Sequence, residues 1–426
     1  MSTRQTILSP DTILLLALGT AHLWFSQISS AILVILLALY VLLDLIDPPT
    51  APQNKRWLFL LRLGIIFFAV LFAAILPTGY SILQRQLEGP ATNANDGLIQ
   101  TEVAVQFLLD GKNPYSEDYT NTILADWRGG EPPFTPIPGI LHHNVYLPFL
   151  FLVSIPPYWL SMTWLGWYDQ RLLYLLFYLA TLLLLPLLVR QKREQLALMT
   201  LIGLNFLFAF FLADGRNDVV ILFGLVLTTA LLARGYEKTA VFTLALTLLT
   251  KHQAWLFLPF FLVYLAPRKI NGRFLPILLQ KTWLLYPTLL AILLPFLLWD
   301  ASAFYSDTIS YIIGTSPYSF PIRGIGISHL LVTFGLIPSY DAPFPFLLLS
   351  LPFSLAALFW GIRRQWGDNS LANLWLGFAI FAFTFQFFSR FFNDNYFIFT
   401  LQALFIALYL DPPASLPVES KQEHLL

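Results

Sequence analysis

The sequence has no cysteine and few charged residues. Its 426 residues include no Cys, and Asp, Glu, Lys and Arg together make up 11%. The absence of Cys excludes disulfides, thiol nucleophiles and Cys-based metal sites. Since soluble domains are roughly one-quarter charged, this composition also excludes an ordinary soluble enzyme. The formal net charge is zero, so nothing indicates a basic surface for nucleic acid.

Apolar residues are abundant and occur in long runs. They make up 57% of the chain, Phe alone occurs 39 times, and the mean hydropathy is +0.68. A run near 20 residues spans a bilayer core of roughly 30 Å. Lipid offers no water to backbone groups, and continuous rather than alternating apolarity favours helices over a barrel. The sequence therefore predicts an all-α, polytopic integral membrane protein. Residues 13–46 are too long an apolar stretch for a signal peptide and are assigned to the membrane.

The apolar runs predict about 12 transmembrane helices in a single transmembrane domain covering residues 1–426. The predicted spans are residues 13–27, 29–46, 57–77, 170–189, 194–213, 217–234, 239–250, 254–266, 282–299, 345–361, 370–388 and 396–410. Two further segments, 146–164 and 326–338, are Pro-rich or short and are interpreted as juxtamembrane or re-entrant.

Basic clusters between the predicted spans set the expected orientation. Twelve crossings place all of them on one face, which the positive-inside rule makes cytoplasmic. The clusters are Lys55-Arg56, Arg190/Lys192/Arg193, Arg234/Lys238, Arg268/Lys269/Arg273 and Arg363-Arg364. We therefore expect a multi-pass protein of the cell membrane with both termini in the cytoplasm. If residues 146–164 also cross the membrane, the number of crossings changes by one and the basic cluster Arg190–Arg193 moves to the opposite side of the membrane.

Residues 239–266 form an unusually short segment between two basic clusters. Its 28 residues are too few for two full spans of about 20 each. The sequence predicts a broken hairpin with Thr250, Lys251, His252 and Gln253 at its tip. Irregular backbone at membrane depth requires burial in protein or a wet cavity. Lys251 with His252 is therefore a candidate anion-binding pair, with snorkelling of the lysine to the membrane surface as the alternative.

Residues 78–145 form one large hydrophilic loop, which the topology places outside the cytoplasm. It contains eight acidic and three basic residues. Leu98, Val103, Phe107 and Leu108 recur at near-helical spacing, which predicts an amphipathic surface helix within it. Asn95-Asp96-Gly97 marks its expected start and Asp110-Gly111 its end.

Asp96 is the leading candidate for a catalytic group in this loop. A carboxylate at the water–lipid boundary is suited to act as a general base toward an acceptor hydroxyl. The structural alternative is a helix N-cap, a position that Asp favours. Glu102 is the second candidate, although it points away from Asp96 on an ideal helix.

Other polar residues follow predicted membrane exits. Asn217 and Asp218 open a predicted helix after a tight turn and are candidates for a cavity wall, although turn chemistry alone explains them. Arg323, followed by His329, is a candidate phosphate clamp or an interfacial anchor. His142-His143 has no acid placed to complete a metal site, so no metal is expected. Residues 393–396 form a weaker cavity candidate. No P-loop, Rossmann, nucleophile-elbow or zinc motif is present.

The order of these motifs is similar to that of a known family. The first motif is an Asp after a membrane exit, followed by Gly-Lys-Asn-Pro-Tyr at 111–115. Asn-Val-Tyr-Leu-Pro at 144–148 and Asn217-Asp218 come next. The last is Lys-His-Gln at 251–253, which precedes a helix that contains Pro259. This resembles the polyprenol-phosphate-sugar-dependent glycosyltransferases of family 87, in the GT-C superfamily. The similarity covers residues 57–410.

The resemblance implies a GT-C-like fold of about a dozen helices and an inverting hexosyl transfer from a polyprenyl-phosphate sugar, commonly mannose. It implies that Asp96 is the base and that Lys251 neutralises the donor phosphate. Family members usually have a Tyr shortly after the loop Asp, where this chain has Gln100 and Thr101, so acceptor contacts are expected to differ. His252, Arg323 and His329 are our own additions as phosphate contacts.

The sequence therefore predicts a membrane glycosyltransferase that acts on the extracytoplasmic side without a cofactor. Its expected partners are the polyprenyl-phosphate-sugar donor, a lipid or glycan acceptor and membrane lipids. The main alternative is a transporter or flippase of lipid-linked saccharides, which usually shows paired broken helices in two repeat halves. A scaffold subunit is a third possibility, but it leaves Lys251 unexplained.

Overall fold

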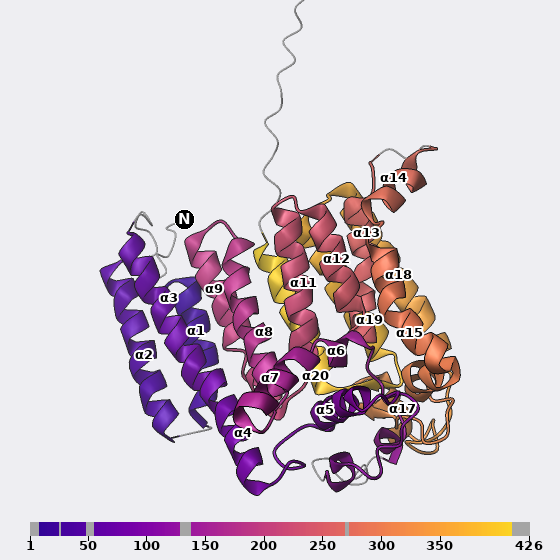
Figure 1. Cartoon of the computed structure of the whole chain (residues 1–426). Helices are drawn as coiled ribbons and strands as arrows, with labels where there is room; N and C mark the ends of the chain where they lie inside the picture. Colours follow the sequence, from indigo (N-terminus) through magenta and orange to yellow (C-terminus); the bar gives the residue numbers. More distant parts are fainter. Residues whose placement is uncertain (1–7, 25–26, 48–54, 128–137, 269–271, 411–426) are drawn as a thin grey trace, which may run out of the picture.

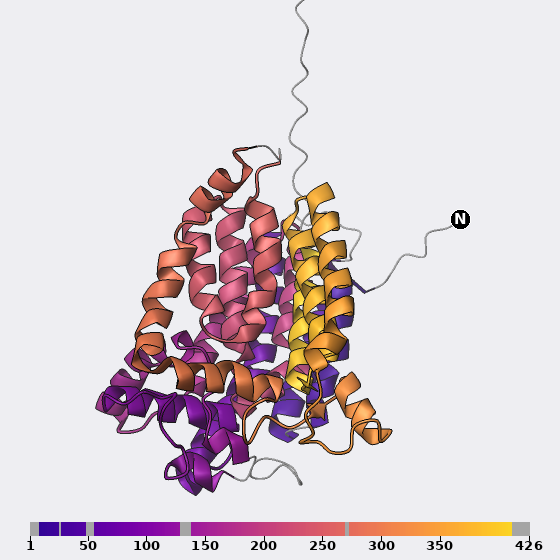
Figure 2. The same cartoon turned by 90° about the vertical axis from the view of Figure 1, so that its right-hand side faces the viewer.

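The computed structural model describes residues 8–24, 27–47, 55–127, 138–268 and 272–410, and these residues form an all-α protein. Long helices run side by side, and α5 (Asp96–Leu109) and α17 (Ile327–Thr333) both lie at one end of the bundle (Figure 1). Figure 2 shows the same arrangement from the side, with the large loop and α17 below the long helices. This end is the one that carries the predicted outer loops.

The remaining helices follow one another along the bundle. In chain order they are α1 Pro10–Ala21, α2 Gln27–Ile46, α3 Arg56–Val70, α4 Leu76–Glu88, α6 Phe149–Leu152, α7 Ile155–Leu165, α8 Arg171–Leu184, α9 Lys192–Gly203, α10 Phe206–Asp214, α11 Asp218–Ala233, α12 Glu237–Leu248, α13 Leu258–Leu265, α14 Phe274–Lys281, α15 Leu285–Tyr305, α16 Tyr311–Ile313, α18 Phe346–Gly367, α19 Leu371–Phe387 and α20 Asp394–Tyr409.

Three helical stretches in the described part of the chain are long and apolar enough to cross a membrane. They are Arg56–Glu88, where a π-helical turn joins α3 to α4, Leu285–Ile313 and Phe346–Gly367. A fourth is obtained if α9 and α10, bent by 47°, count as one span. The prediction of about 12 spans is therefore not supported by helix length and composition. Proline, glycine and charged residues divide many apolar runs into helices of 10–17 residues, below the usual length of a span.

The predicted loop helix is present, but its surroundings differ from the expectation. Helix α5 begins after Asn95 and ends before Asp110, as the capping signals predict. All residues from Gly97 to Val105 are buried, so α5 packs inside the protein and has no free polar face there. The prediction of an amphipathic surface helix is wrong for this part, because the polar side chains of α5 find partners within the protein. Residues 128–137 of the same loop lie outside the described residues.

The segments predicted to be short or broken are short helices in the structure. Residues 146–164 cover α6 and all of α7 except its last residue, and residues 326–338 contain α17. The predicted hairpin at 239–266 is broken between α12 and a 3-10 helix at His252–Phe257, which leads into α13. Backbone N–H groups of Leu147 and Phe149 donate to the carbonyls of Thr250 and Leu249, at 3.2 and 2.9 Å, and hold the break. The broken hairpin is confirmed.

Two short strands join distant parts of the chain near this break. β1 (Arg323–Gly324) pairs in parallel with β2 (Phe391–Phe392). Gly324 has a φ of +94°, and a Cβ at this position would clash with the carbonyl oxygen of Phe392. Glycine therefore permits the close approach that brings Arg323 beside the α19–α20 connection.

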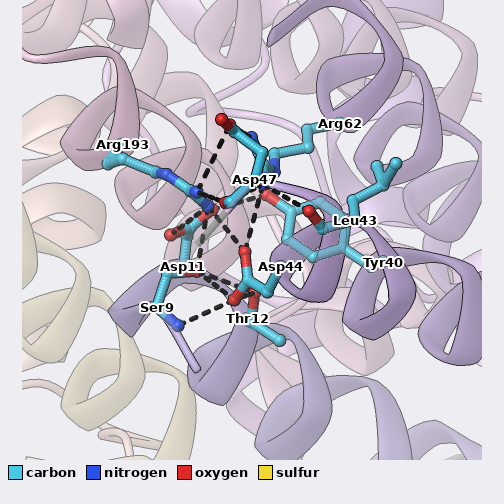
Figure 3. A network of polar contacts seen from close by, with 9 residues as sticks. All are labelled: Ser9, Asp11, Thr12, Tyr40, Leu43, Asp44, Asp47, Arg62 and Arg193. Atoms are coloured by element: carbon cyan, nitrogen blue, oxygen red, sulfur yellow. Dashed lines mark hydrogen bonds and ion pairs between the residues drawn. The ribbon is translucent and has the colours of Figure 1, made fainter. Parts of the chain in front are cut away.

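A buried network of charges ties together α1, α2, α3 and α9 (Figure 3). The Asp44 Oδ1 atom accepts hydrogen bonds from Arg62 and Arg193, at 3.1 and 2.9 Å. Arg62 also pairs with Asp47 at 3.0 Å, and Arg193 with Asp11 at 3.2 Å. These partners come from separate helices, so the network fixes how the N-terminal helices dock.

Candidate functional site

In the described part of the chain, a large cavity lies at the end of the bundle where α5 begins. Its volume is about 2080 Å³. Its wall is formed by parts of α4, the start of α5, the α10–α11 turn, residues 251–253, residues 311–325, the start of α18 and the α19–α20 connection. The hairpin break, the β1–β2 pair and the loop helix therefore all face one space.

Most of the residues predicted for the site line this cavity. Those that do are Asp96, Asn217, Lys251, His252, Arg323 and His329, whereas Glu102 and Asp218 do not. The cavity thus brings together side chains that are up to 233 positions apart in the sequence, from Asp96 to His329.

Asp96 occupies the first residue of α5, and its carboxyl group is half-buried in the cavity wall. The N-cap is Asn95, whose side chain accepts a hydrogen bond from the N–H of Gly97 at 3.1 Å. The capping interpretation of Asp96 is therefore wrong. Burial raises the pKa of Asp96, and the nearby Asp214 carboxylate adds to this, whereas a hydrogen bond from Gly97 and the charges of Arg323 and Arg216 oppose it. The group is suited to accept a proton.

Arg216 forms the charged rim beside Asp96. Its guanidinium donates to Asp214 at 2.9 Å, Asp394 at 2.7 Å and Asn395 at 3.0 Å. The backbone carbonyl of Asp214 accepts from the N–H of Asn95 at 2.8 Å. The α10–α11 turn is therefore joined directly to the start of α5, which sets the position of Asp96.

Lys251 lies in the hairpin break with its ammonium facing three partners. Nζ donates to Asn217 Oδ1 and to Asp218 Oδ1, each at 3.0 Å, and lies 4.6 Å from the centre of the Tyr396 ring. Asp218 also accepts a hydrogen bond from Asn395. Asp218 therefore lies outside the cavity wall and holds the ammonium group of Lys251 in place from that side. Buried charges in proteins are usually paired in this way.

Glu102 belongs to a separate buried cluster of charges. Its carboxylate accepts two hydrogen bonds from Arg85, at 2.9 and 2.7 Å, and one from the backbone N–H of Gln170 at 2.8 Å. Arg85 also pairs with Asp169 at 3.0 Å. The interpretation of Glu102 as a second candidate for the site is not supported, because it lies outside the cavity wall and its oxygens are occupied.

Arg390 is a cation in the cavity wall that sequence reasoning missed. Its side chain is 3% exposed and donates to the carbonyls of Phe320 and Ala342. Within the described residues, its Nη2 atom has no hydrogen-bond partner. Gly314 packs directly against the guanidinium, where a Cβ would clash. The signal was available, because Arg390 lies between two strongly apolar runs, as Lys251 does.

The histidine pair at 142–143 contacts acids but does not build a metal site. His143 Nδ1 lies 2.7 Å from Asp307, and His142 Nδ1 lies 3.3 Å from Asp118. Among the residues that the structure describes, no group of three or more His, Cys, Asp or Glu side chains is arranged to hold a metal ion. His143 lies beside Tyr311, a ring of the cavity wall.

Comparison of the chain with protein-family models, with curated proteins and with solved structures finds no match. The chemistry of the site therefore has to be inferred from its own residues.

Proposed function

We propose that this protein is a membrane glycosyltransferase that moves a sugar from a polyprenyl-phosphate donor to a hydroxyl of a lipid or glycan acceptor. The observation that carries the proposal is one cavity that holds a carboxyl group of raised pKa together with several cations. This transfer needs a carboxylate base to take the proton of the attacking hydroxyl. It also needs cations to stabilise the phosphate that leaves.

The wall of the cavity also supports a lipid-linked substrate. Phe72 and Leu76 come from the candidate span Arg56–Glu88, and Phe346 and Leu347 from the candidate span Phe346–Gly367. The cavity therefore has apolar walls contributed by helices suited to the membrane. A polyprenyl tail leaving between these helices keeps its apolar surface out of water, while its phosphate and sugar remain near Asp96.

In the proposed reaction, Asp96 takes the proton from the acceptor hydroxyl as its oxygen attacks the anomeric carbon of the donor sugar. The new bond joins that oxygen to the anomeric carbon, and the bond to the phosphate oxygen breaks with its electron pair. Attack from the face opposite the phosphate inverts the configuration. The products are the glycosylated acceptor and polyprenyl phosphate.

Cations of the cavity wall stabilise the negative charge that develops on the departing phosphate. Lys251 and Arg323, proposed from the sequence, and Arg390, found in the structure, supply the positive charge. His252 and His329 are proposed as further phosphate contacts. Burial and the charge of Lys251 lower the pKa of His252 to about 4, so its ring serves as a neutral hydrogen-bond donor. Preorganised electrostatic stabilisation of this kind is usually the largest catalytic contribution. Since Asp218 and Asn217 already hold Lys251, its ammonium needs little reorganisation when the charge appears.

The test is sugar transfer by purified protein in nanodiscs. Labelled polyprenyl-phosphate mannose, glucose and arabinose are supplied with a native lipid extract, and Asp96→Asn is compared with wild type. Loss of a general base predicts a fall of about 10²–10⁴-fold in transfer rate. Asp110→Asn is the matched control, because Asp110 follows the opposite end of α5, is exposed and lies outside the cavity wall.

Unchanged transfer in Asp96→Asn would remove Asp96 as the base. Binding of donor without turnover in wild type would instead favour the transporter or flippase alternative. Loss of transfer in both variants would point to a general folding effect, which a melting curve for each variant identifies.

A further inference from the structure

Two buried glutamines have side-chain amides with no partner for either end. Gln253 is 7% exposed and Gln402 is 0% exposed. In the part of the chain that the structure describes, neither the Oε1 nor the Nε2 atom of either residue makes a hydrogen bond. Burying a polar group without a hydrogen-bond partner is unfavourable, so such a group needs an explanation.

The two glutamines differ in whether they line the large cavity. Gln253 lines the large cavity, directly after Lys251 and His252, whereas Gln402 lies in the middle of α20 and does not line it. A molecule in the cavity is therefore able to complete the hydrogen bonds of Gln253 after a small shift. No such route exists for Gln402.

The cavity wall contains further uncharged groups without partners. Among the described residues, the hydroxyl of Tyr311 and the side-chain Oε1 atom of Gln386 are buried and make no hydrogen bond, and both residues line the cavity. Together with Gln253, these residues place unpartnered donors and acceptors in the wall of one cavity, within reach of a bound molecule after a small shift of side chains. A phosphate offers acceptors alone, and a polyprenyl tail offers neither. Hydroxyl groups both donate and accept, so a polyhydroxylated ring matches this set.

We propose that the Gln253 amide binds hydroxyl groups of the sugar carried by the donor and thereby selects the sugar. This inference rests on the proposed function and adds its specificity-determining residue. The cations of the cavity wall take the phosphate, and Gln253 takes the uncharged part of the same molecule. Sites that hydrogen-bond a substrate hydroxyl discriminate strongly against analogues that lack it, because buried polar groups are then left unpaired.

The experiment compares Gln253→Leu with Gln402→Leu in full-length protein in nanodiscs. Each variant replaces an unpartnered amide by an apolar side chain of similar size, so both are expected to melt at the same temperature as wild type or higher. Affinity is measured for radiolabelled polyprenyl-phosphate mannose and, separately, for the same polyprenyl phosphate without sugar. Gln253→Met, which keeps an unbranched chain, is the second variant if Gln253→Leu does not fold.

Wild type is expected to bind the mannose-bearing lipid more tightly than the bare lipid. Gln253→Leu is expected to lose about 10–100-fold in affinity for the mannose-bearing lipid and to keep its affinity for the bare lipid. Gln402→Leu is expected to match wild type for both lipids. Replacing mannose by glucose on the donor should change the affinity of wild type and not that of Gln253→Leu.

Wild-type affinity of Gln253→Leu for both lipids would overturn the assignment. An equal loss for both lipids would also overturn it, because it indicates a general change of the cavity. The two proposals fail separately. If wild type transfers the sugar and Gln253→Leu binds both lipids as wild type does, the sugar contact alone is refuted. If binding depends on the sugar and on Gln253 but wild type shows no turnover, the transferase proposal is refuted and the sugar contact remains.

Discussion

At the residue scale, the properties of Asp96 follow from its neighbours. Asn95 takes the cap of α5, so the Asp96 carboxyl is left to face the cavity. Burial raises its pKa above the ordinary carboxyl range, and Arg323 opposes that rise. A base is active only when deprotonated, so transfer should decline as the pH falls through this raised pKa.

We predict that Arg323→Gln moves the acid limb of the pH–rate profile to higher pH. The positive charge of Arg323 lowers the pKa of Asp96, so its removal lets that pKa rise further, and a higher pH is then needed to deprotonate the base. The measurement is kcat/KM for sugar transfer as a function of pH, from about pH 4 to about pH 9. Lys112→Gln, at an exposed lysine of the large loop at residues 78–145, is the control and should leave the acid limb in place. If the acid limb is at the same pH in Arg323→Gln as in wild type, the charge of Arg323 does not affect the pKa of the catalytic base.

The candidate site residues that the structure brings to one cavity carry local signals in the sequence. Asp96 follows a membrane exit beside a helix start, and Lys251 interrupts an apolar stretch too short for two spans. Glu102 was placed in the site because its partners are invisible in the sequence: Arg85 lies 17 positions away, and Arg85 in turn binds Asp169, 84 positions away. The unpartnered amide of Gln253 is equally a tertiary property, since any neighbouring helix could have satisfied it.

At the element scale, helix ends were easier to predict than helix surroundings. The start of α5 within Asn95-Asp96-Gly97 and the Gly111 turn after the helix, with a φ of +73°, are local signals that the structure follows, although the cap is Asn95 and not Asp96. Whether α5 lies on a surface or inside the protein depends on what packs over it. Charge clusters between helices are equally hard to predict from the sequence, because their members, such as Asp44 and Arg193, come from helices far apart in the chain.

We predict that Arg193→Met destabilises the docking of the N-terminal helices by about 3–5 kcal/mol. Removing one member of a buried ion network leaves the other charges uncompensated, and Arg193 serves Asp11 and Asp44 in this network (Figure 3). The measurement is unfolding in detergent, followed by tryptophan fluorescence. Lys112→Met is the control, because its ion pair with Glu117 is half exposed and spans 3.6 Å, and it should cost below about 1 kcal/mol. Equal stability of the two variants would contradict a docking role.

At the scale of the whole molecule, composition predicts a membrane protein but not the number of its spans. Apolar runs near 20 residues are common in the sequence, whereas the structure breaks many of them at proline or polar residues into shorter helices. Hydropathy measures only what a run contains, and the breaks depend on backbone geometry. The stretch Arg56–Glu88 is the longest of the candidate spans, at 33 residues, and its two ends should therefore face opposite sides of the membrane.

This orientation is open to a direct test, since the natural chain has no cysteine and a single introduced one is labelled without background. Lys55 precedes the candidate span and Thr120 lies in the large loop at residues 78–145 that follows it, and both are exposed. We predict that a membrane-impermeant maleimide labels Thr120→Cys in intact cells, and Lys55→Cys only after the membrane is permeabilised, because basic residues flank spans on the cytoplasmic side. Labelling of both in intact cells, or of neither, would mean that Arg56–Glu88 does not cross. The reverse pattern would place Asp96 and its cavity on the cytoplasmic side, where a nucleotide-linked donor would replace the lipid-linked one as the substrate to test.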